Sequence, residues 1–128
     1  MTENKTILIV DDETDVISYL TVLLKDHGFD VITARNGKEA FETAKEKMPD
    51  LITLDITMPQ ESGVRAFRDL QEEPSTKEIP IIIITGVSGE FKGFIEKRKK
   101  VHPPVAYFEK PINRDELIAK IREILNPG

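Results

Sequence analysis

Cysteine and tryptophan are absent from the 128 residues, and aromatic residues together make up only 6% of the chain. Without cysteine the chain can form no disulfide, no thiolate metal site and no cysteine nucleophile. Long apolar runs are lacking near the N-terminus, where only Ile7–Val10 precede two aspartates. That run is too short for a signal peptide or a membrane span. A net charge of −5 argues against direct binding to nucleic acid.

Hydrophobic residues make up 39% of the chain and charged residues 32%, which is the balance of a soluble globular protein. A length of 128 residues suits one domain and leaves little room for a second. We therefore expect residues 1–128 to form a single cytoplasmic domain, with no output domain after it.

Strand-like and helix-like segments alternate along the chain. The expected strands are Ile7–Val10, Asp30–Ala34, Leu51–Leu54, Ile81–Ile84 and Ala106–Phe108. Four expected helices each carry apolar residues at helical spacing, which should face the core. In chain order these residues are Val16, Tyr19, Leu20, Leu23 and Leu24; Ala40, Phe41 and Ala44; Val64, Phe67 and Leu70 within Ser62–Glu72; and Leu117, Ile118, Ile121, Ile124 and Leu125. Gly28 is expected to end the first helix, and Asn36 and Asn113 to cap the second and the last.

The segment Gly89–Val101 is expected to form a fourth helix, although two glycines and the basic run Lys97–Lys100 give it low helix propensity. Repeated strand-helix units require right-handed crossover connections. The fold class is therefore α/β, a parallel sheet with helices on both faces. Ligands of such sheets bind at the carboxyl ends of the strands.

Polar side chains follow the expected strands at those ends. Asp11 and Asp12 follow the first strand, Asp55 the third, Thr85 the fourth, and Lys110 lies just after the fifth. Each residue alone has an ordinary explanation, such as a helix cap for the aspartate pair or a turn for Asp55. Their joint occurrence at four strand ends indicates a site.

Three carboxylates about 4 Å apart repel one another by about 4 kcal/mol per pair at an effective dielectric constant near 20. Oxygen ligands without histidine or cysteine favour Mg²⁺, which also binds phosphate oxygens. Lys110 and Thr85 suit two further phosphate oxygens. Neither a Gly-rich nucleotide loop ending in Lys-Ser or Lys-Thr nor a Gly-x-Gly-x-x-Gly motif is present. The set therefore predicts a site for one phosphoryl group, with a carboxylate as its acceptor.

In this arrangement the chain resembles the response regulator receiver domains of two-component signalling. The resemblance rests on Asp11-Asp12, on Asp55 to Pro59 followed by Gly63, on Thr85, and on Lys110-Pro111 with Tyr107 three residues before the lysine. It implies a flavodoxin-like (βα)₅ fold with strand order 2-1-3-4-5. It also implies a phosphoacceptor regulator that catalyses only its own phosphorylation and dephosphorylation.

Carried over residue by residue, the resemblance implies that Asp55 is the phosphoacceptor. Asp12 and Asp55 would hold Mg²⁺ through their carboxylates, Asp11 mainly through a metal-bound water, and Thr57 through its backbone carbonyl. Thr85 and Lys110 would bind the phosphoryl oxygens, and Thr85 and Tyr107 would form a switch. The implied partners are a histidine kinase or histidine phosphotransfer protein, and a downstream effector that binds the face formed by the fourth and fifth strands and their helices.

Two other functions remain open at this point. A Mg²⁺-dependent phosphatase would use the same nucleophile but needs a general acid two residues beyond it, where Thr57 stands. A structural pseudo-receiver would bind no phosphate, and the complete acidic set argues against it.

Overall fold

The structure is a computed structural model that describes residues 4–58, 62–85 and 106–125. In chain order the elements are β1 (Thr6–Val10), α1 (Thr14–Asp26), β2 (Asp30–Ala34), α2 (Gly37–Lys47), β3 (Leu51–Asp55), α3 (Ser62–Glu72), β4 (Ile81–Thr85), β5 (Ala106–Glu109) and α5 (Arg114–Leu125). Every expected strand is present, with ends shifted by one residue at most. The helix expected over Gly89–Val101 lies outside the described residues.

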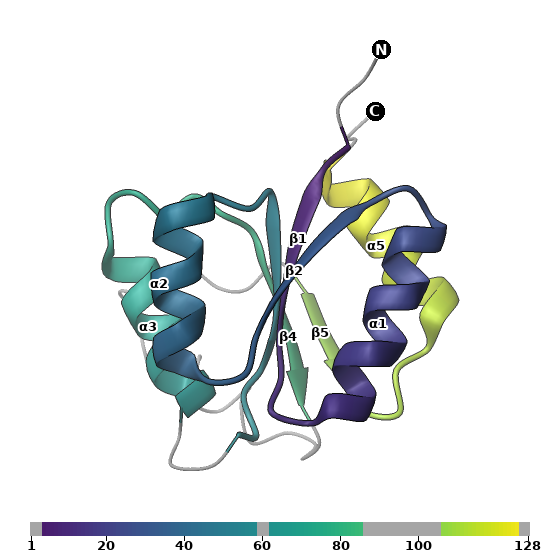
Figure 1. Ribbon diagram of the computed structural model, residues 1–128, viewed down its shortest axis with the longest axis horizontal. Helices are drawn as coiled ribbons and strands as arrows, with labels where there is room; N and C mark the ends of the chain where they lie inside the picture. Colours follow the sequence, from purple (N-terminus) through teal and green to yellow (C-terminus); the bar gives the residue numbers. More distant parts are fainter. Residues whose placement is uncertain (1–3, 59–61, 86–105, 126–128) are drawn as a thin grey trace.

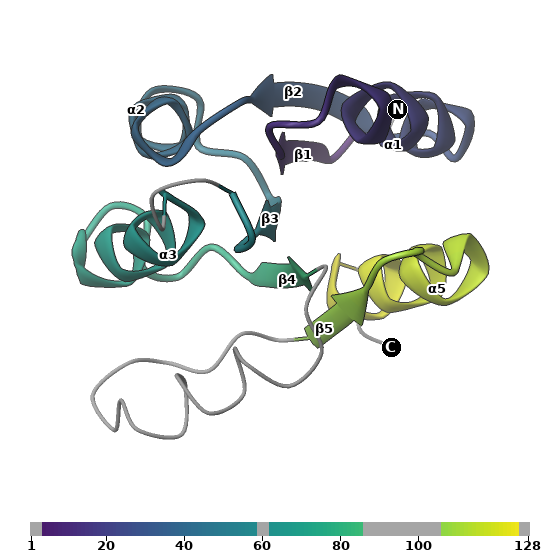
Figure 2. The ribbon, with the colours of Figure 1, turned by 90° about the horizontal axis from the view of Figure 1, so that it is seen from below.

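The five strands form one parallel sheet in the order β2-β1-β3-β4-β5, which confirms the expected fold class and strand order. Helices α2 and α3 cover one face of the sheet, and α1 and α5 cover the other (Figures 1 and 2). The register pairs Asp55 with Ile84 and Thr85 with Glu109. The strand ends that carry the predicted site residues therefore meet at one edge of the sheet.

Strand side chains alternate between the two faces and so contribute to two cores. Leu8 and Leu54 pack with Phe67 of α3 in the core beneath α2 and α3. Ile7 and Ile9 pack in the second core, which also contains residues of α1 and α5. All five residues of β4 are buried, as expected for a central strand covered on both faces. These two cores pack against both faces of the sheet and so position the strand ends.

Side-chain caps begin two of the helices as expected. The Asn36 Oδ1 accepts a hydrogen bond from the Glu39 backbone N–H at 2.8 Å at the start of α2. The Asn113 Oδ1 accepts one from the Glu116 N–H at 3.0 Å at the start of α5. Gly28 follows α1 with φ at 89°, a conformation that glycine adopts without steric cost.

The prediction that Tyr19 faces the core is wrong, because its side chain is 46% exposed. Leu20 and Leu24 lie at the centre of the buried stripe of α1. Successive helix residues are rotated by about 100°, so Tyr19 points away from the direction of Leu20. Among the described residues, no helix is long and apolar enough to cross a membrane.

Candidate phosphoryl-acceptor site

Four strands deliver the predicted residues to the carboxyl edge of the sheet. Asp11 directly follows β1, and its backbone N–H donates to the Ala34 carbonyl at the end of β2. Asp55 is the last residue of β3. Beyond β5, the Lys110 N–H donates to the Thr85 carbonyl at 2.9 Å, which ties the lysine backbone to the end of β4. The sheet thus places an amine next to two carboxylates that are distant in sequence.

The two carboxylate oxygens of Asp55 have different partners. Oδ1 accepts hydrogen bonds from the Thr57 backbone N–H at 2.8 Å and from the Thr57 hydroxyl at 2.6 Å. Oδ2 accepts one from the Lys110 ammonium at 3.1 Å. The residue is only 1% exposed. Thr57 holds one oxygen, and the other faces the lysine.

Lys110 Nζ lies among three carboxylates. It is 2.8 Å from Glu13 Oε1, 3.1 Å from Asp55 Oδ2 and 3.3 Å from Asp11 Oδ2. Burial alone would lower the pKa of Lys110, but the hydrogen bonds to Glu13 and Asp55 and the charges of Asp55 and Asp11 outweigh it. The pKa therefore lies above its ordinary value, and the ammonium keeps its charge.

Asp11 is almost fully buried, with 1% of its surface exposed. Burial raises the pKa of Asp11 to about 6; repulsion from Asp55 adds to the rise, while the Glu13 N–H and Lys110 oppose it. Oδ1 accepts the Glu13 backbone N–H at 2.9 Å. Oδ2 has no hydrogen-bond donor within the described part of the chain, although Lys110 lies within ion-pair distance.

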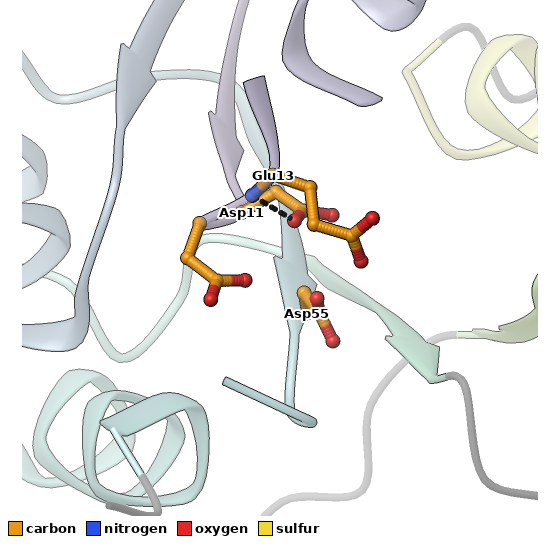
Figure 3. Close-up of side chains that lie close together, drawn as sticks. Asp11, Glu13 and Asp55 are labelled. Carbon is orange, nitrogen blue, oxygen red and sulfur yellow. Dashed lines mark hydrogen bonds between the residues drawn. The ribbon is translucent and has the colours of Figure 1, made fainter. Parts of the chain in front are cut away.

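Asp11, Asp12, Glu13 and Asp55 can each direct one carboxylate oxygen into a group whose atoms lie within 4.8 Å of one another. Figure 3 shows Asp11, Glu13 and Asp55 close together around the end of β3. Hard oxygen donors and a buried Asp11 oxygen without a donor fit Mg²⁺. The site's chemistry thus agrees with the predicted metal.

The remaining predicted residues occupy different surroundings. Asp12 and Thr57 are exposed at the mouth of the site. Thr85 is 4% exposed at the end of β4. Tyr107 lies in β5 opposite Ile83, and its side chain is outside the described residues. Glu13, and neither aspartate of the pair, occupies the N-cap position of α1. The helix-cap explanation for Asp11-Asp12 is therefore not supported.

Sequence reasoning missed Glu13 as a member of the site, since an acid next to an acid pair is ordinary in the first turn of a helix. The resemblance assigns only the Thr57 backbone carbonyl to the metal site, whereas the structure shows that the Thr57 hydroxyl also contacts the acceptor carboxylate. Gly63 was noted only as part of a motif. A Cβ built on it would lie 2.2 Å from the Asp55 carbonyl oxygen, so α3 contacts the acceptor's own backbone.

We expect Asp11→Asn to stabilise the metal-free protein at neutral pH. The folded-state pKa of about 6 exceeds the reference value of 3.8, so the stabilising contribution of Asp11 is complete below pH 3.8 and is lost as pH rises through 6. The shift corresponds to a free energy on the order of 3 kcal/mol. Asparagine keeps the Oδ1 acceptor but carries no charge.

The measurement is urea unfolding in chelator at about pH 4.5 and pH 7.5, where the stability gained by the variant should be larger at the higher pH. Asp15→Asn is the control, because Asp15 is exposed in the first turn of α1. An equal gain at both pH values would show that the Asp11 charge does not destabilise the fold.

The parallel five-stranded sheet, with acids and a lysine at its carboxyl edge, places the chain among the doubly wound α/β domains that bind a ligand at that edge. The family model of the response regulator receiver domain matches residues 7–122 of this chain. The chain is 34% identical over 119 residues to PilH of Pseudomonas aeruginosa, covering 93% of this chain and 96% of PilH. It is 34% identical over 122 residues to PhoP of Bacillus subtilis, covering 95% of this chain but 49% of that regulator.

Among solved structures, the chemotaxis response regulator CheY4 of Vibrio cholerae superposes with a TM-score of 0.82 and 25% identity, covering 96% of this chain and 100% of CheY4. The chain therefore belongs to the response regulator receiver domain family. Receiver domains are phosphorylation-dependent switches of two-component signalling rather than conventional enzymes. They receive the phosphoryl group from histidine kinases or phosphotransfer proteins, and the family generally binds Mg²⁺ at an acidic cluster.

Proposed function

We propose that Asp55 is the residue that accepts the phosphoryl group, supplied by a histidine kinase or a histidine phosphotransfer protein. The observation that carries the proposal is the environment of its carboxylate: Thr57 holds Oδ1, and the Lys110 ammonium lies 3.1 Å from Oδ2. A buried carboxylate with one oxygen held and the other beside a cation is arranged for attack on phosphorus.

In the proposed reaction Asp55 Oδ2 forms the new bond to phosphorus. The bond from phosphorus to the donor's histidine nitrogen breaks, and that nitrogen takes the electron pair. Lys110 transfers its hydrogen bond from Oδ2 to a phosphoryl oxygen and offsets the negative charge there. Thr85 donates a hydrogen bond to a second phosphoryl oxygen. Hydrolysis of the acyl phosphate later restores the carboxylate.

The proposed metal ligands are carboxylate oxygens of Asp12 and Asp55 and the backbone carbonyl of Thr57, with Asp11 acting mainly through a metal-bound water. A bound Mg²⁺ would neutralise part of the charge on the acids and on the phosphoryl oxygens. The chain's own contribution is to hold Asp11 Oδ1 through the Glu13 N–H, which fixes the carboxylate plane. Oδ2 is left facing the other acids and Lys110.

Incubation with acetyl phosphate and Mg²⁺, followed by intact mass measurement, tests the proposed function. We expect the mass of one phosphoryl group, removable by hydroxylamine as an acyl phosphate is. Failure of the wild-type chain to gain mass with either acetyl phosphate or a phosphorylated histidine donor would contradict the proposal. The phosphatase alternative would instead give turnover of a phosphomonoester.

We propose that residues 1–128 form one cytoplasmic domain. This domain would make no direct contact with nucleic acid or membrane. An effector would bind the face formed by β4, β5 and α5, together with the helix expected over Gly89–Val101, which lies outside the described residues. The support is positional. β4 ends at Thr85, and Lys110 directly follows β5, so both strands connect that face with the phosphoryl site.

We further propose that phosphorylation is read through Thr85 and Tyr107. A phosphoryl oxygen would draw the Thr85 hydroxyl inward, and Tyr107 on the neighbouring strand would turn from exposed to buried. A hydrogen bond to a charged group contributes about 1.5–3 kcal/mol, which shifts a two-state population by about tenfold to a hundredfold. Such a shift suffices for signalling without an all-or-none change.

Thr85→Ala should still accept phosphate, more slowly, but lose most of the phosphorylation-dependent change at Tyr107. Tyr19 is the only other tyrosine, so fluorescence in a Tyr19→Phe background reports on Tyr107 alone. Tyr19 is exposed on α1, which makes that background substitution mild. An equal fluorescence change with and without the Thr85 hydroxyl would show that this coupling does not exist.

A further inference from the structure

Glu13 stands at the N-cap position of α1 but makes no side-chain capping bond. Its side chain turns to Lys110 instead, and Oε1 lies 2.8 Å from the ammonium nitrogen. This is the shortest of the three ion pairs of Lys110. The Glu13 backbone is held in turn, because its N–H donates to Asp11 Oδ1, as the dashed line in Figure 3 shows.

The other two partners of Lys110 are engaged by the proposed reaction. Asp55 Oδ2 becomes the oxygen bonded to phosphorus, so it no longer offers a charged acceptor. Asp11 is proposed to hold the metal mainly through a bound water, and its Oδ2 has no hydrogen bond from Lys110 even now. Glu13 is 60% exposed, and its carboxylate is outside the set proposed to hold the metal or the phosphoryl group.

A lysine ammonium has three N–H donors. With one N–H on Glu13, the N–H now on Asp55 and the third N–H remain for the incoming phosphoryl oxygens. We propose that Glu13 is a positioning residue of the phosphoryl site, which keeps the Lys110 ammonium beside Asp55 while its other partners change. The inference rests on the proposed function of Asp55 and Lys110.

Two other roles for Glu13 make different predictions. Its carboxylate belongs to the acidic group whose oxygens lie within 4.8 Å, so it could be a metal ligand. It could also retard phosphorylation, because its charge repels an anionic donor and its ion pair competes for Lys110. The positioning role requires contact with Lys110 and not merely a negative charge nearby.

The test measures the rate of phosphorylation by acetyl phosphate at saturating Mg²⁺ for wild type, Glu13→Ala and Glu13→Gln. Glu13→Ala removes the contact with Lys110, so its phosphorylation rate should fall by about two- to fivefold, the size expected for an exposed ion pair. Glutamine keeps an oxygen acceptor at the same reach and should restore part of the rate. Asp15→Asn removes a nearby charge that makes no ion pair with Lys110 within the described residues and should leave the rate unchanged.

Two readouts do not depend on phosphorylation. The ¹⁵N signal of the Lys110 ammonium in the metal-free protein should shift or broaden in Glu13→Ala and persist in Asp15→Asn, because slow hydrogen exchange requires a held ammonium. The Mg²⁺ dissociation constant should change only modestly. A weakening of Mg²⁺ binding by about tenfold or more would show that Glu13 acts on the metal site rather than on Lys110 and would overturn the proposal.

The remaining outcomes are equally decisive. A faster rate in Glu13→Ala would show that Glu13 retards phosphorylation, and an unchanged rate would show that Lys110 needs no such anchor; either result rejects the positioning role. Failure of the wild type itself to accept phosphate, with Lys110 still held by Glu13 in the NMR spectrum, would instead count against the proposed function.

Discussion

Replacement of Asp55 by asparagine is expected to abolish hydroxylamine-sensitive phosphorylation by acetyl phosphate, because the attacking carboxylate oxygen is lost. The fold should survive. An asparagine oxygen at the Oδ1 position still accepts the two hydrogen bonds from Thr57, and the side chain keeps its shape within the buried end of β3. Intact mass before and after hydroxylamine gives the measurement.

Lys110→Met supplies a second variant in the same experiment, since it removes the ammonium while Asp55 stays in place. It should accept phosphate more slowly and retain hydroxylamine sensitivity. Circular dichroism on both variants controls for folding. An equally labile phosphate on Asp55→Asn would mean that another carboxylate is the acceptor, and peptide mapping would then identify it.

The second large effect is expected from Gly63→Ala at the start of α3. A Cβ at this position would lie 2.2 Å from the Asp55 carbonyl oxygen and 2.6 Å from the Ile56 Cα. Both neighbours are backbone atoms, so either the helix or the acceptor segment must move. Alanine favours a helix over glycine by about 1 kcal/mol, but overpacking of this kind costs about 1–3 kcal/mol or more. We therefore expect a net loss of stability together with slower phosphorylation.

Gly28→Ala is the matched control. Gly28 has φ at 89° and no atom within 4 Å of a built Cβ, so alanine there strains the backbone without touching the site. Urea unfolding should show a loss of stability for both variants, whereas the phosphorylation rate at low temperature should fall only for Gly63→Ala. If Gly63→Ala is more stable than wild type, the start of α3 does not contact the Asp55 backbone as closely as the structure indicates.

Local patterns in the sequence were sufficient to predict the strands and helices in the described part of the chain. The all-apolar run Ile81–Ile84 can only be satisfied by burial on both faces, and it became the fully buried strand β4. Asn36 and Asn113 cap α2 and α5 through hydrogen bonds to backbone N–H groups three residues later, and both capping bonds are present. Alternation of strands with helices, through the handedness of crossovers, placed the predicted polar residues at one edge of the sheet.

Periodicity was less reliable at the margin of a helix face. Tyr19 satisfies the apolar spacing of α1, yet its side chain is 46% exposed. The spacing of apolar residues does not give the width of the buried face of α1. That width depends on how β1 and α5 pack against the helix. Leu20 and Leu24 occupy the covered part.

The sequence by itself determined which residue types stand at the strand ends, because burial and crossover geometry act on local patterns that can be read directly. Only the tertiary structure decided which atom faces which: that Thr57 holds one oxygen of Asp55, that Glu13 pairs with Lys110, and that Gly63 touches the acceptor backbone. The Glu13–Lys110 contact joins side chains 97 positions apart. The Thr57 and Gly63 contacts are short in sequence, but they depend on how the chain after β3 and helix α3 are placed. Their distances depend on the docking of strands and helices, which no local pattern encodes.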